Sequence, residues 1–543
     1  MNAAAPNNPF QQAIVVSLPT QAFDDVYKTD TKQERVSAGL VFSLPGSWQA
    51  SVDIGWNRSE LDNFATRAIL PTFVTAVRTG QVDILRDTLA YPLDVSAFLG
   101  PRTSTQNVPS TLKSGTARVG GPLFNLPGGP VNATVQLEHR EMNVGQSVQN
   151  YLGQVSEIFP EKNQQVQSLY AELRAPIVSE ANAVPGIREL ELQLAGRRDE
   201  YTTRAGQRRY SFDTPLVEQE ATLSSTNPTI ALRYVPFESL ALRASYGKGF
   251  MPPTIDQVTS SPFNSVLTVQ DIRRGGETVS TLWRNFGGTV DLEPEESESW
   301  SAGFVFSPTW LPGLRLSADY TNIKKTNNIY QTFNGQFFVD NEEKFPYTVI
   351  REAPAAGDPF GVGRIIAIDT LLVNIARAEV EAVDLQLNYG FSTDWGSFDF
   401  YSLATWQTHY RTQVSPESPV VENVGITKDN PLKLRLNAGI TWSLGNWSAG
   451  WAARYFDSYV VSTSPTTIAN QGSLRVPSQN YHDLFLGYKT DAGNSWASGL
   501  ELQLGFKNVL DKAPPFDATS FPYYSTYGDP YMASYYMSVK KSF

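Results

Sequence analysis

The chain has 543 residues, of which 43 are Lys or Arg and 54 are Asp or Glu, giving a formal net charge of −11. Only 18% of the residues are charged, against about a quarter in ordinary soluble chains; 12% are aromatic and none is cysteine. The lack of cysteine excludes disulfide scaffolds and thiolate sites, and the acidic balance without a basic run argues against nucleic acid as a partner. The length is sufficient for several soluble domains or for one large β architecture.

The start of the chain, Met1 to Phe10, has neither the basic stretch nor the apolar run of a secretory signal peptide. A membrane helix needs about 20 consecutive apolar residues. The most apolar stretch, Gly361 to Ala376, is interrupted by Arg364 and Asp369. We therefore expect no membrane helix, and a chain that is either cytoplasmic or a mature or truncated form of a longer protein.

The repeated pattern along the chain is alternation of apolar and polar residues, which is typical of strands with two unlike faces. In the first such window Trp48, Val52 and Trp56 share one parity, while polar residues such as Asp53 occupy the other. The clearest windows are 48–57, 131–138, 189–194, 239–246, 314–321, 432–444 and 500–507. Several continue for the roughly 9 to 11 residues of a membrane-spanning strand, which exceeds the usual strand of a soluble sandwich.

The connections between windows alternate between short and long. Short Pro, Gly or Asn turns such as Leu44 to Ser47 alternate with long polar segments. The long segments are Arg58 to Asn107, Lys248 to Glu293, Thr326 to Thr370, Ser458 to Ser478 and Asp511 to Pro530. Short turns on one side and long loops on the other are typical of outer-membrane barrels. The sequence therefore predicts an all-β, transmembrane antiparallel β-barrel of about 17 or 18 strands, with short periplasmic turns and long extracellular loops.

The last segment, Tyr531 to Phe543, alternates in the same way and closes on an aromatic residue. It resembles the signature by which outer-membrane barrels are handed to their assembly machinery. Phe543 is the candidate assembly signal, and Lys541 departs from the pattern because an apolar residue is usual there.

Internal motifs resemble those of the TonB-dependent outer-membrane receptors. Arg243 to Thr254 is similar to the family's strand-to-loop motif, and Phe506 to Pro515 to its penultimate-strand motif. The segment Leu292 to Trp300 resembles the return of the same loop into the next strand. The motif residues are Gly249, Phe250, Pro253, Asn508, Asp511 and Pro514.

The resemblance implies a 22-stranded barrel with an N-terminal plug, which takes up a scarce ligand such as an iron chelate, cobalamin or an oligosaccharide. Energy in the family is relayed by TonB through a segment before the plug. Residues 1–543 are expected to be one receptor-like barrel region, N-terminally incomplete, without plug or signal peptide. TonB is then a partner only of a longer form with its plug, and the other expected partners are outer-membrane lipid, the assembly machinery and a small-molecule or oligosaccharide ligand.

Aromatic and charged residues in the loops are candidates for ligand contact because aromatic faces stack on sugars or aromatic chelators. These candidates are Trp283, Arg284, Phe286, Tyr523, Tyr524 and Tyr527. Packing of the loops against each other is the competing interpretation for each. The carboxylates between Glu293 and Glu298 are interpreted as a solvated, lumen-side face.

We expect no cofactor, no metal site and no enzymatic activity. The histidines at 139, 409 and 482 are far apart in the sequence, and no nucleophile is accompanied by a recognisable base and acid. The expected location is the outer membrane of a Gram-negative bacterium. A passive porin-like channel and, less favoured, a soluble all-β binding module remain as alternatives.

Overall fold

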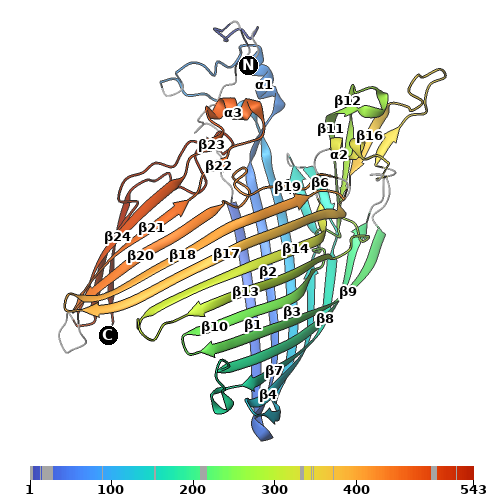
Figure 1. Ribbon diagram of the computed structural model, residues 1–543. Coiled ribbons are helices and arrows are strands. Elements are labelled where there is room, and N and C mark those ends of the chain that lie inside the picture. Colours follow the sequence, from blue (N-terminus) through green and yellow to red (C-terminus); the bar gives the residue numbers. More distant parts are fainter. Residues whose placement is uncertain are drawn as a thin grey trace.

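The computed structural model is a tall, curved antiparallel sheet with loop structures at one end and tight turns at the other (Figure 1). It describes residues 4–10, 12, 14, 28–87, 90–151, 154–207, 217–330, 335–343, 345, 348–370, 372–416, 418–490, 498–520 and 523–542. The first described residues lie beside α1 at the loop end, and the C-terminus lies at the turn end (Figure 1). No helix within these residues has the length and apolar character to cross a membrane.

The main sheet has 20 strands in the described part of the chain. Three of them, β5, β6 and β19, are short additions at the loop end, and the other 17 follow one another as an antiparallel meander. The meander strands are β1 (Lys28–Leu44), β2 (Trp48–Ile69), β3 (Leu99–Leu126), β4 (Gly129–Val144), β7 (Lys162–Val178), β8 (Glu189–Gln207), β9 (Val217–Phe237), β10 (Leu240–Met251), β13 (Glu295–Phe306), β14 (Leu314–Tyr330), β17 (Val373–Thr393), β18 (Gly396–Gln413), β20 (Leu434–Leu444), β21 (Trp447–Phe456), β24 (Gln479–Lys489), β25 (Leu500–Lys507) and β26 (Ser534–Lys541).

The two faces of the sheet follow the alternation of the sequence. Paired residues of neighbouring strands share a face, so Val52 and Leu40 lie on the apolar face, and Asp53 lies on the opposite one. Apolar-face side chains are widely accessible, as shown by Ile54 at 61% and Leu137 at 56% exposed. Side chains on the polar face reach one another across a whole strand, as Arg243 reaches Asp319 and Arg197 reaches Glu138, which identifies the polar face as the concave one. The predicted all-β antiparallel architecture is confirmed.

The loop end contains folded elements of its own. A four-stranded sheet in the order β11, β12, β16, β15 packs against α2, around a core that includes Phe338 and Ile368, neither of which is exposed. Its strands come from two loops, one between β10 and β13 and the other between β14 and β17. The loop elements are α1 (Pro71–Arg78), β5 (Ser147–Tyr151), β6 (Gln154–Phe159), β11 (Ser260–Asp271), β12 (Glu277–Gly287), α2 (Gly335–Asp340), β15 (Val349–Arg351), β16 (Ile365–Thr370), β19 (Val421–Glu422), β22 (Tyr459–Val460), α3 (Pro465–Gln471) and β23 (Arg475–Val476).

The sheet has two open edges in the described residues, β1 and β26, since no pairing joins these strands there. All positions of β1 are exposed, as are all but the last of β26. Both strands run from the loop end to the turn end, because β1 enters a tight turn and β26 follows a long loop. A direct β1–β26 contact would therefore be parallel, whereas closure in the antiparallel pattern needs an odd number of further strands.

One sequence-based boundary and one assignment of side chains to a face were wrong. The segment Arg58 to Asn107 is not one loop, because β2 continues to Ile69 and β3 starts at Leu99. Polar residues near the loop end still pair across strands, as Ser59 pairs with Ser110. Alternation of apolar and polar residues cannot indicate a strand where neither face is in an apolar environment. The interpretation of the glutamates of β13 as lumen-facing fails for Glu296 and Glu298, which share the apolar face with Trp300, whereas Glu295 has the parity of the polar face.

Candidate functional site

A row of mostly polar and charged residues crosses the concave face at one level. Each member pairs directly with the next in the sheet register. From β10 to β21 the row reads Arg243, Gly303, Asp319, Asp384, Thr405, Arg435 and Phe456. Strands that are distant in sequence therefore present their functional groups side by side.

Arg243 reaches across one whole strand to Asp319. Its Nε lies 2.7 Å from Asp319 Oδ1, and its second nitrogen contacts the other carboxylate oxygen. The strand between them carries Gly303, where an added Cβ would lie 2.1 Å from Asp319 Oδ1. The glycine thus leaves the space through which a bidentate ion pair forms, and this pair neutralises the two charges.

The remaining charges of the row have weaker partners. Asp384 accepts a hydrogen bond from Thr405 Oγ1 at 2.6 Å. The Arg435 guanidinium lies 5.5 Å from the centroid of the Phe456 ring, within the range of a cation–π interaction. One carboxylate and one guanidinium therefore remain available for polar contacts with a ligand.

Tyr527, from the loop between β25 and β26, covers this part of the row. Its ring stacks on Phe456 with centroids 5.3 Å apart, and it helps to line a cavity of about 420 Å³ together with Arg243, Asp384 and Arg435. Burial raises the pKa of the Tyr527 phenol, so it is a neutral hydrogen-bond donor near neutral pH. The cavity combines an aromatic ring with two carboxylates and two guanidiniums, of which Arg243 and Asp319 are already paired with each other.

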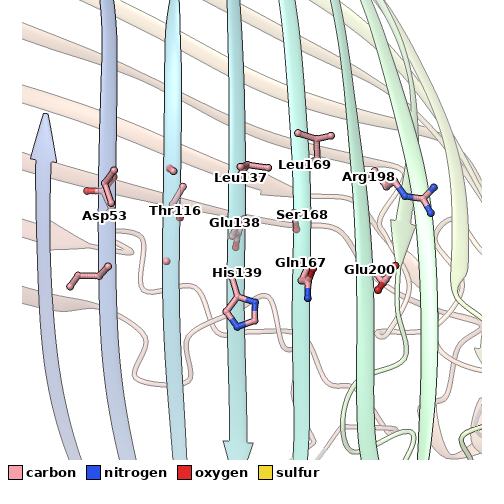
Figure 2. A pocket seen from close by; sticks show the side chains of 14 residues that line it. Asp53, Thr116, Leu137, Glu138, His139, Gln167, Ser168, Leu169, Arg198 and Glu200 are labelled. Carbon is pink, nitrogen blue, oxygen red and sulfur yellow. The ribbon is translucent and has the colours of Figure 1, made fainter. Parts of the chain in front are cut away.

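A second polar cluster lies on the early strands. Asp53, Thr116, Glu138 and Ser168 stand at one level on neighbouring strands (Figure 2), in agreement with the register. Arg197 donates to Glu138 Oε2 and to Ser168 Oγ, both at 2.9 Å. Its Nε also contacts an Asp199 oxygen at 2.8 Å. The residues of Figure 2 alternate between the two faces of the sheet, so they do not enclose a single cavity. The cluster around Arg197 consists of paired groups that stabilise the sheet.

The predicted ligand residues separate into two places. Of the tyrosines, Tyr527 is at the cavity, whereas Tyr523 is 56% exposed and stacks on Phe516 with centroids 6.4 Å apart. Tyr524 forms an isolated β-bridge with Phe516. The structure therefore brings one predicted tyrosine to the row and leaves the other two elsewhere on the same loop.

Trp283 and Arg284 lie on β12 in the loop sheet, away from the row. Trp283 Nε1 donates to Thr370 Oγ1 at 3.0 Å, and Arg284 holds both oxygens of Asp369 at 2.6 and 2.8 Å. Asp369 is 2% exposed, and its burial raises the pKa of the carboxyl despite the opposing effect of Arg284. These contacts secure β12 to β16. Phe286 lies on the same strand, but its side chain is outside the described part of the structure.

The first family motif marks the upper end of β10. An added Cβ at Gly249 would lie 2.4 Å from Ser297 Oγ, so the glycine allows β13 to approach closely. The Phe250 ring lies 5.5 Å from that of Tyr201, and Pro253 is buried where the loop begins. Arg243 of the same motif is the residue that starts the row.

The second motif ends β25 and anchors the last loop. Asn508 is 3% exposed with φ +48°, and its side chain bonds the backbone of Lys512 in both directions, at 2.9 and 3.1 Å. Asp511 accepts from the Ala533 N–H at 3.0 Å, immediately before β26. Pro514 contacts Gly528 in the same loop. The motif is thus a structural clamp between the last two strands, and the predicted assembly signal Phe543 lies outside the described residues.

The histidines lie apart from the row. His409 Nδ1 is 2.8 Å from Glu422 Oε2, and Trp451 Nε1 donates to His482 Nδ1 at 3.2 Å. His139 lies on β4, two strands from the Arg198-bearing β8 (Figure 2). Among the described residues no group of three or more potential ligands could hold a metal ion.

The row itself was missed by sequence reasoning. Its members come from seven strands with long insertions between them, so their alignment depends on register rather than on any local motif. The alternation within each strand predicts which face of the sheet a residue lies on. It does not predict which residues of neighbouring strands lie opposite each other. Arg243 is a member of the row that lies within a family motif.

A wide antiparallel meander with an apolar convex face, a polar concave face and loops at one end defines the wall of an outer-membrane type of barrel. The family model described as "TonB dependent receptor-like, beta-barrel" matches residues 3–509. The chain belongs to this family of receptors and transporters. No curated protein matches the chain.

Solved structures of low sequence identity share the fold. The pyoverdine outer membrane receptor FpvA of Pseudomonas aeruginosa PAO1, bound to pyoverdine, is 14% identical with a TM-score of 0.57, covering 95% of this chain and 62% of that one. The ferric-catecholate import receptor Fiu of E. coli K12 is 13% identical with a TM-score of 0.51, and the match covers 89% of this chain and 60% of that one. The copper transporter OprC is 10% identical with a TM-score of 0.55, and the match covers 94% of this chain and 65% of that one. The chain thus spans less than two thirds of each of these three proteins.

Proposed function

We propose that the chain forms the wall and ligand-facing loops of an outer-membrane receptor that takes up a scarce small ligand, and that the cavity beneath Tyr527 is the ligand contact. The observation that carries this proposal is the cross-strand row, which places Asp384, Arg435 and Phe456 on the concave face under an aromatic loop residue. Such a combination of a few oriented polar groups and aromatic surface suits a small-molecule site.

The ligand class proposed is an iron chelate, cobalamin or an oligosaccharide. Support comes from the names of structural relatives, one bound to pyoverdine and another a ferric-catecholate importer. The aromatic stack of Phe456 and Tyr527 would contact a planar chelator or a sugar ring, and Asp384 and Arg435 would bond its polar substituents.

Driven uptake belongs, in this proposal, to a longer form of the protein. A plug and a TonB-contacting segment would supply gating and energy, and outer-membrane lipid would surround the apolar face. The open edge of β1 supports further strands there, since each unpaired backbone group in hydrocarbon costs several kcal/mol. Assembly through Phe543 is proposed on the sequence signature alone.

The experiment is ligand binding by the purified protein in detergent, measured by tryptophan fluorescence with ferric pyoverdine, ferric enterobactin, cobalamin and maltohexaose as probes. We expect one probe to bind, and Tyr527→Ala and Arg435→Gln each to weaken its binding at least tenfold. Arg364→Gln, on an exposed position of the loop sheet outside the cavity, is the matched control and should bind as wild type does. Binding that is unchanged in both Tyr527→Ala and Arg435→Gln would refute the site.

A passive channel is the competing function. Liposome swelling separates the two, because a porin-like pore admits small sugars at a rate independent of Tyr527. Swelling at such a rate, with none of the four probes bound, would favour the channel.

A further inference from the structure

The charges that line the cavity beneath Tyr527 cancel one another. The guanidiniums of Arg243 and Arg435 and the carboxylates of Asp319 and Asp384 are its charged lining groups. A site for a polyanion or a polycation carries a surplus of the opposite charge, because binding partners have complementary electrostatic potentials. This cavity carries no such surplus, so it suits a ligand whose own charges also sum to zero.

Two of the four charges satisfy each other. Arg243 holds both oxygens of the Asp319 carboxylate, with its Nε 2.7 Å from Oδ1. A bidentate ion pair of this kind uses the hydrogen-bonding capacity of both partners. The selectivity of the cavity for charge therefore depends on the other two groups.

The Asp384 carboxylate lies beside a like charge. It pairs directly with Asp319 in the register of β14 and β17, and like charges directly opposite on neighbouring strands repel each other. Within the described part of the chain it accepts a hydrogen bond from the neutral Thr405 hydroxyl at 2.6 Å, and no cationic side chain there forms an ion pair with it. A cationic group of a ligand beside Asp384 would relieve this repulsion.

Arg435 presents the opposite charge on the same face. Thr405 lies between it and Asp384 in the sheet, so the backbones of the two charged residues are about 10 Å apart. Its guanidinium faces the Phe456 ring and forms no ion pair with a carboxylate of the described residues. The planar fork of an arginine matches the two oxygens of a carboxylate. An anionic group of a ligand would therefore bind at this end.

The rim of the cavity adds an aromatic surface and no net charge. Tyr527 stacks on Phe456 with ring centroids 5.3 Å apart. Burial raises the pKa of the Tyr527 phenol, and the positive charge of Arg435 opposes this rise, so the guanidinium acts at the covering ring. Asp429 also influences this phenol, but its carboxylate is paired with Lys428 Nζ at 2.9 Å.

The charge of the whole chain disfavours a polyanionic ligand as well. With 43 basic and 54 acidic residues its formal charge is −11. The field of such a chain repels an approaching polyanion, whereas a ligand whose charges sum to zero is not repelled.

We propose that the ligand bound beneath Tyr527 is dipolar, with an amine or guanidine group at Asp384 and a carboxylate at Arg435. A planar part of the same ligand stacks on the aromatic pair of Tyr527 and Phe456. The proposal rests on the proposed function, in which this cavity is the ligand contact. Among the ligand classes named there it selects a chelate built from amino-acid units, which carry both kinds of group, over a polyanionic chelate or an uncharged oligosaccharide.

The test uses the purified chain in detergent and four small molecules that share a para-substituted benzene ring. Para-(aminomethyl)benzoate is dipolar, terephthalate is a dianion, para-bis(aminomethyl)benzene is a dication, and para-(hydroxymethyl)benzamide is uncharged. Isothermal titration calorimetry measures the affinity of each. We expect the wild-type protein to bind the dipolar compound at least tenfold more tightly than each of the other three. Arg364→Gln, on the loop sheet, should give the same order of affinities.

Charge reversal at either position should change the preferred compound. Asp384→Arg leaves a surplus of positive charge and should bind terephthalate at least tenfold more tightly than the dipolar compound. Arg435→Asp leaves a surplus of negative charge and should prefer the diamine by the same factor. The double variant Asp384→Arg with Arg435→Asp should again prefer the dipolar compound, bound end to end in the opposite direction. This recovery also shows that the single substitutions leave the cavity folded.

Three results would overturn the dipolar proposal: wild-type binding of another compound at least as tightly as the dipolar one, no measurable binding of any of the four, or preferences that charge reversal leaves unchanged. The proposed function fails on a different result. For that, the binding of ferric pyoverdine, ferric enterobactin, cobalamin and maltohexaose must be unaffected by Tyr527→Ala. A receptor that binds one of these probes through Tyr527 but prefers terephthalate keeps its proposed function and loses the dipolar ligand.

Discussion

Replacing Gly303 with alanine tests whether the row depends on a gap between Arg243 and Asp319. The new Cβ would lie 2.1 Å from Asp319 Oδ1 and 2.6 Å from the Ala318 carbonyl oxygen, which belongs to the backbone and cannot rotate away. The carboxylate must therefore leave Arg243, and the two strands must separate locally. Both consequences follow from one methyl group.

The cost has two parts. The ion pair is partly exposed, with the Arg243 side chain at 55% and that of Asp319 at 25%, so its loss accounts for about 0.2 to 1 kcal/mol. Forcing an extra carbon into a tight contact adds about 1 to 3 kcal/mol. We expect Gly303→Ala to lower the free energy of unfolding by about 1 to 4 kcal/mol in total.

The assay is urea unfolding of the protein in lipid vesicles, followed by tryptophan fluorescence. Gly196→Ala is the matched control, because an added Cβ there meets no atom within 4 Å and the residue also lies within a strand. Asp319→Ala in the Gly303→Ala background should restore part of the loss. Equal stability of Gly303→Ala and Gly196→Ala would refute the reasoning.

Three further predictions concern the loops and the clamp. Asn508→Ala should lower the free energy of unfolding by about 2 to 3 kcal/mol in the same urea assay, because it removes two backbone-directed hydrogen bonds and places alanine at φ +48°; an unchanged midpoint would contradict the clamp. Trp283→Phe leaves the buried Thr370 hydroxyl without its donor and should cost about 1 to 2 kcal/mol, measured as faster proteolysis of the loop sheet. Hydrogen bonding from Arg274 lowers the pKa of Asp358 below its ordinary value of 3.8, so the stabilisation is complete above that value and is lost as the pH falls below it. Protease resistance of the loop sheet should therefore fall in that acid range. Arg274→Gln should weaken this pH dependence, while the backbone N–H of Phe360 still lowers the pKa of Asp358; an identical acid profile in the variant would count against the ion pair.

Sequence alternation predicted the sheet well because its physical cause is local. Residues such as Trp48, Val52 and Trp56 alternate because neighbouring side chains of a strand meet different surroundings. The expectation of about 17 or 18 spanning strands agrees with the 17-strand meander of the described residues. Alternation failed where strands continue with polar residues on both faces, as β2 does after Asn57.

The candidate site was predicted only in part, because it depends on register. Tyr527 was singled out as a loop aromatic, and the structure places it at the cavity. Trp283 and Arg284 had the same local character, but their partners Thr370 and Asp369 come from another loop more than 80 residues away in sequence. Pairing between distant loops leaves no periodic signal, so composition could not separate packing residues from exposed ones.

The central claim is that the concave polar face lines a watery interior while the convex face contacts lipid. The absence of cysteine allows a direct measurement with single-cysteine variants at the adjacent positions Ser317 and Ala318, which lie on opposite faces of β14. A charged, water-soluble maleimide is added to isolated outer membranes carrying each variant. Ser317→Cys should be labelled in intact membranes, and Ala318→Cys only after detergent is added. Equal labelling of both positions in intact membranes would contradict the account.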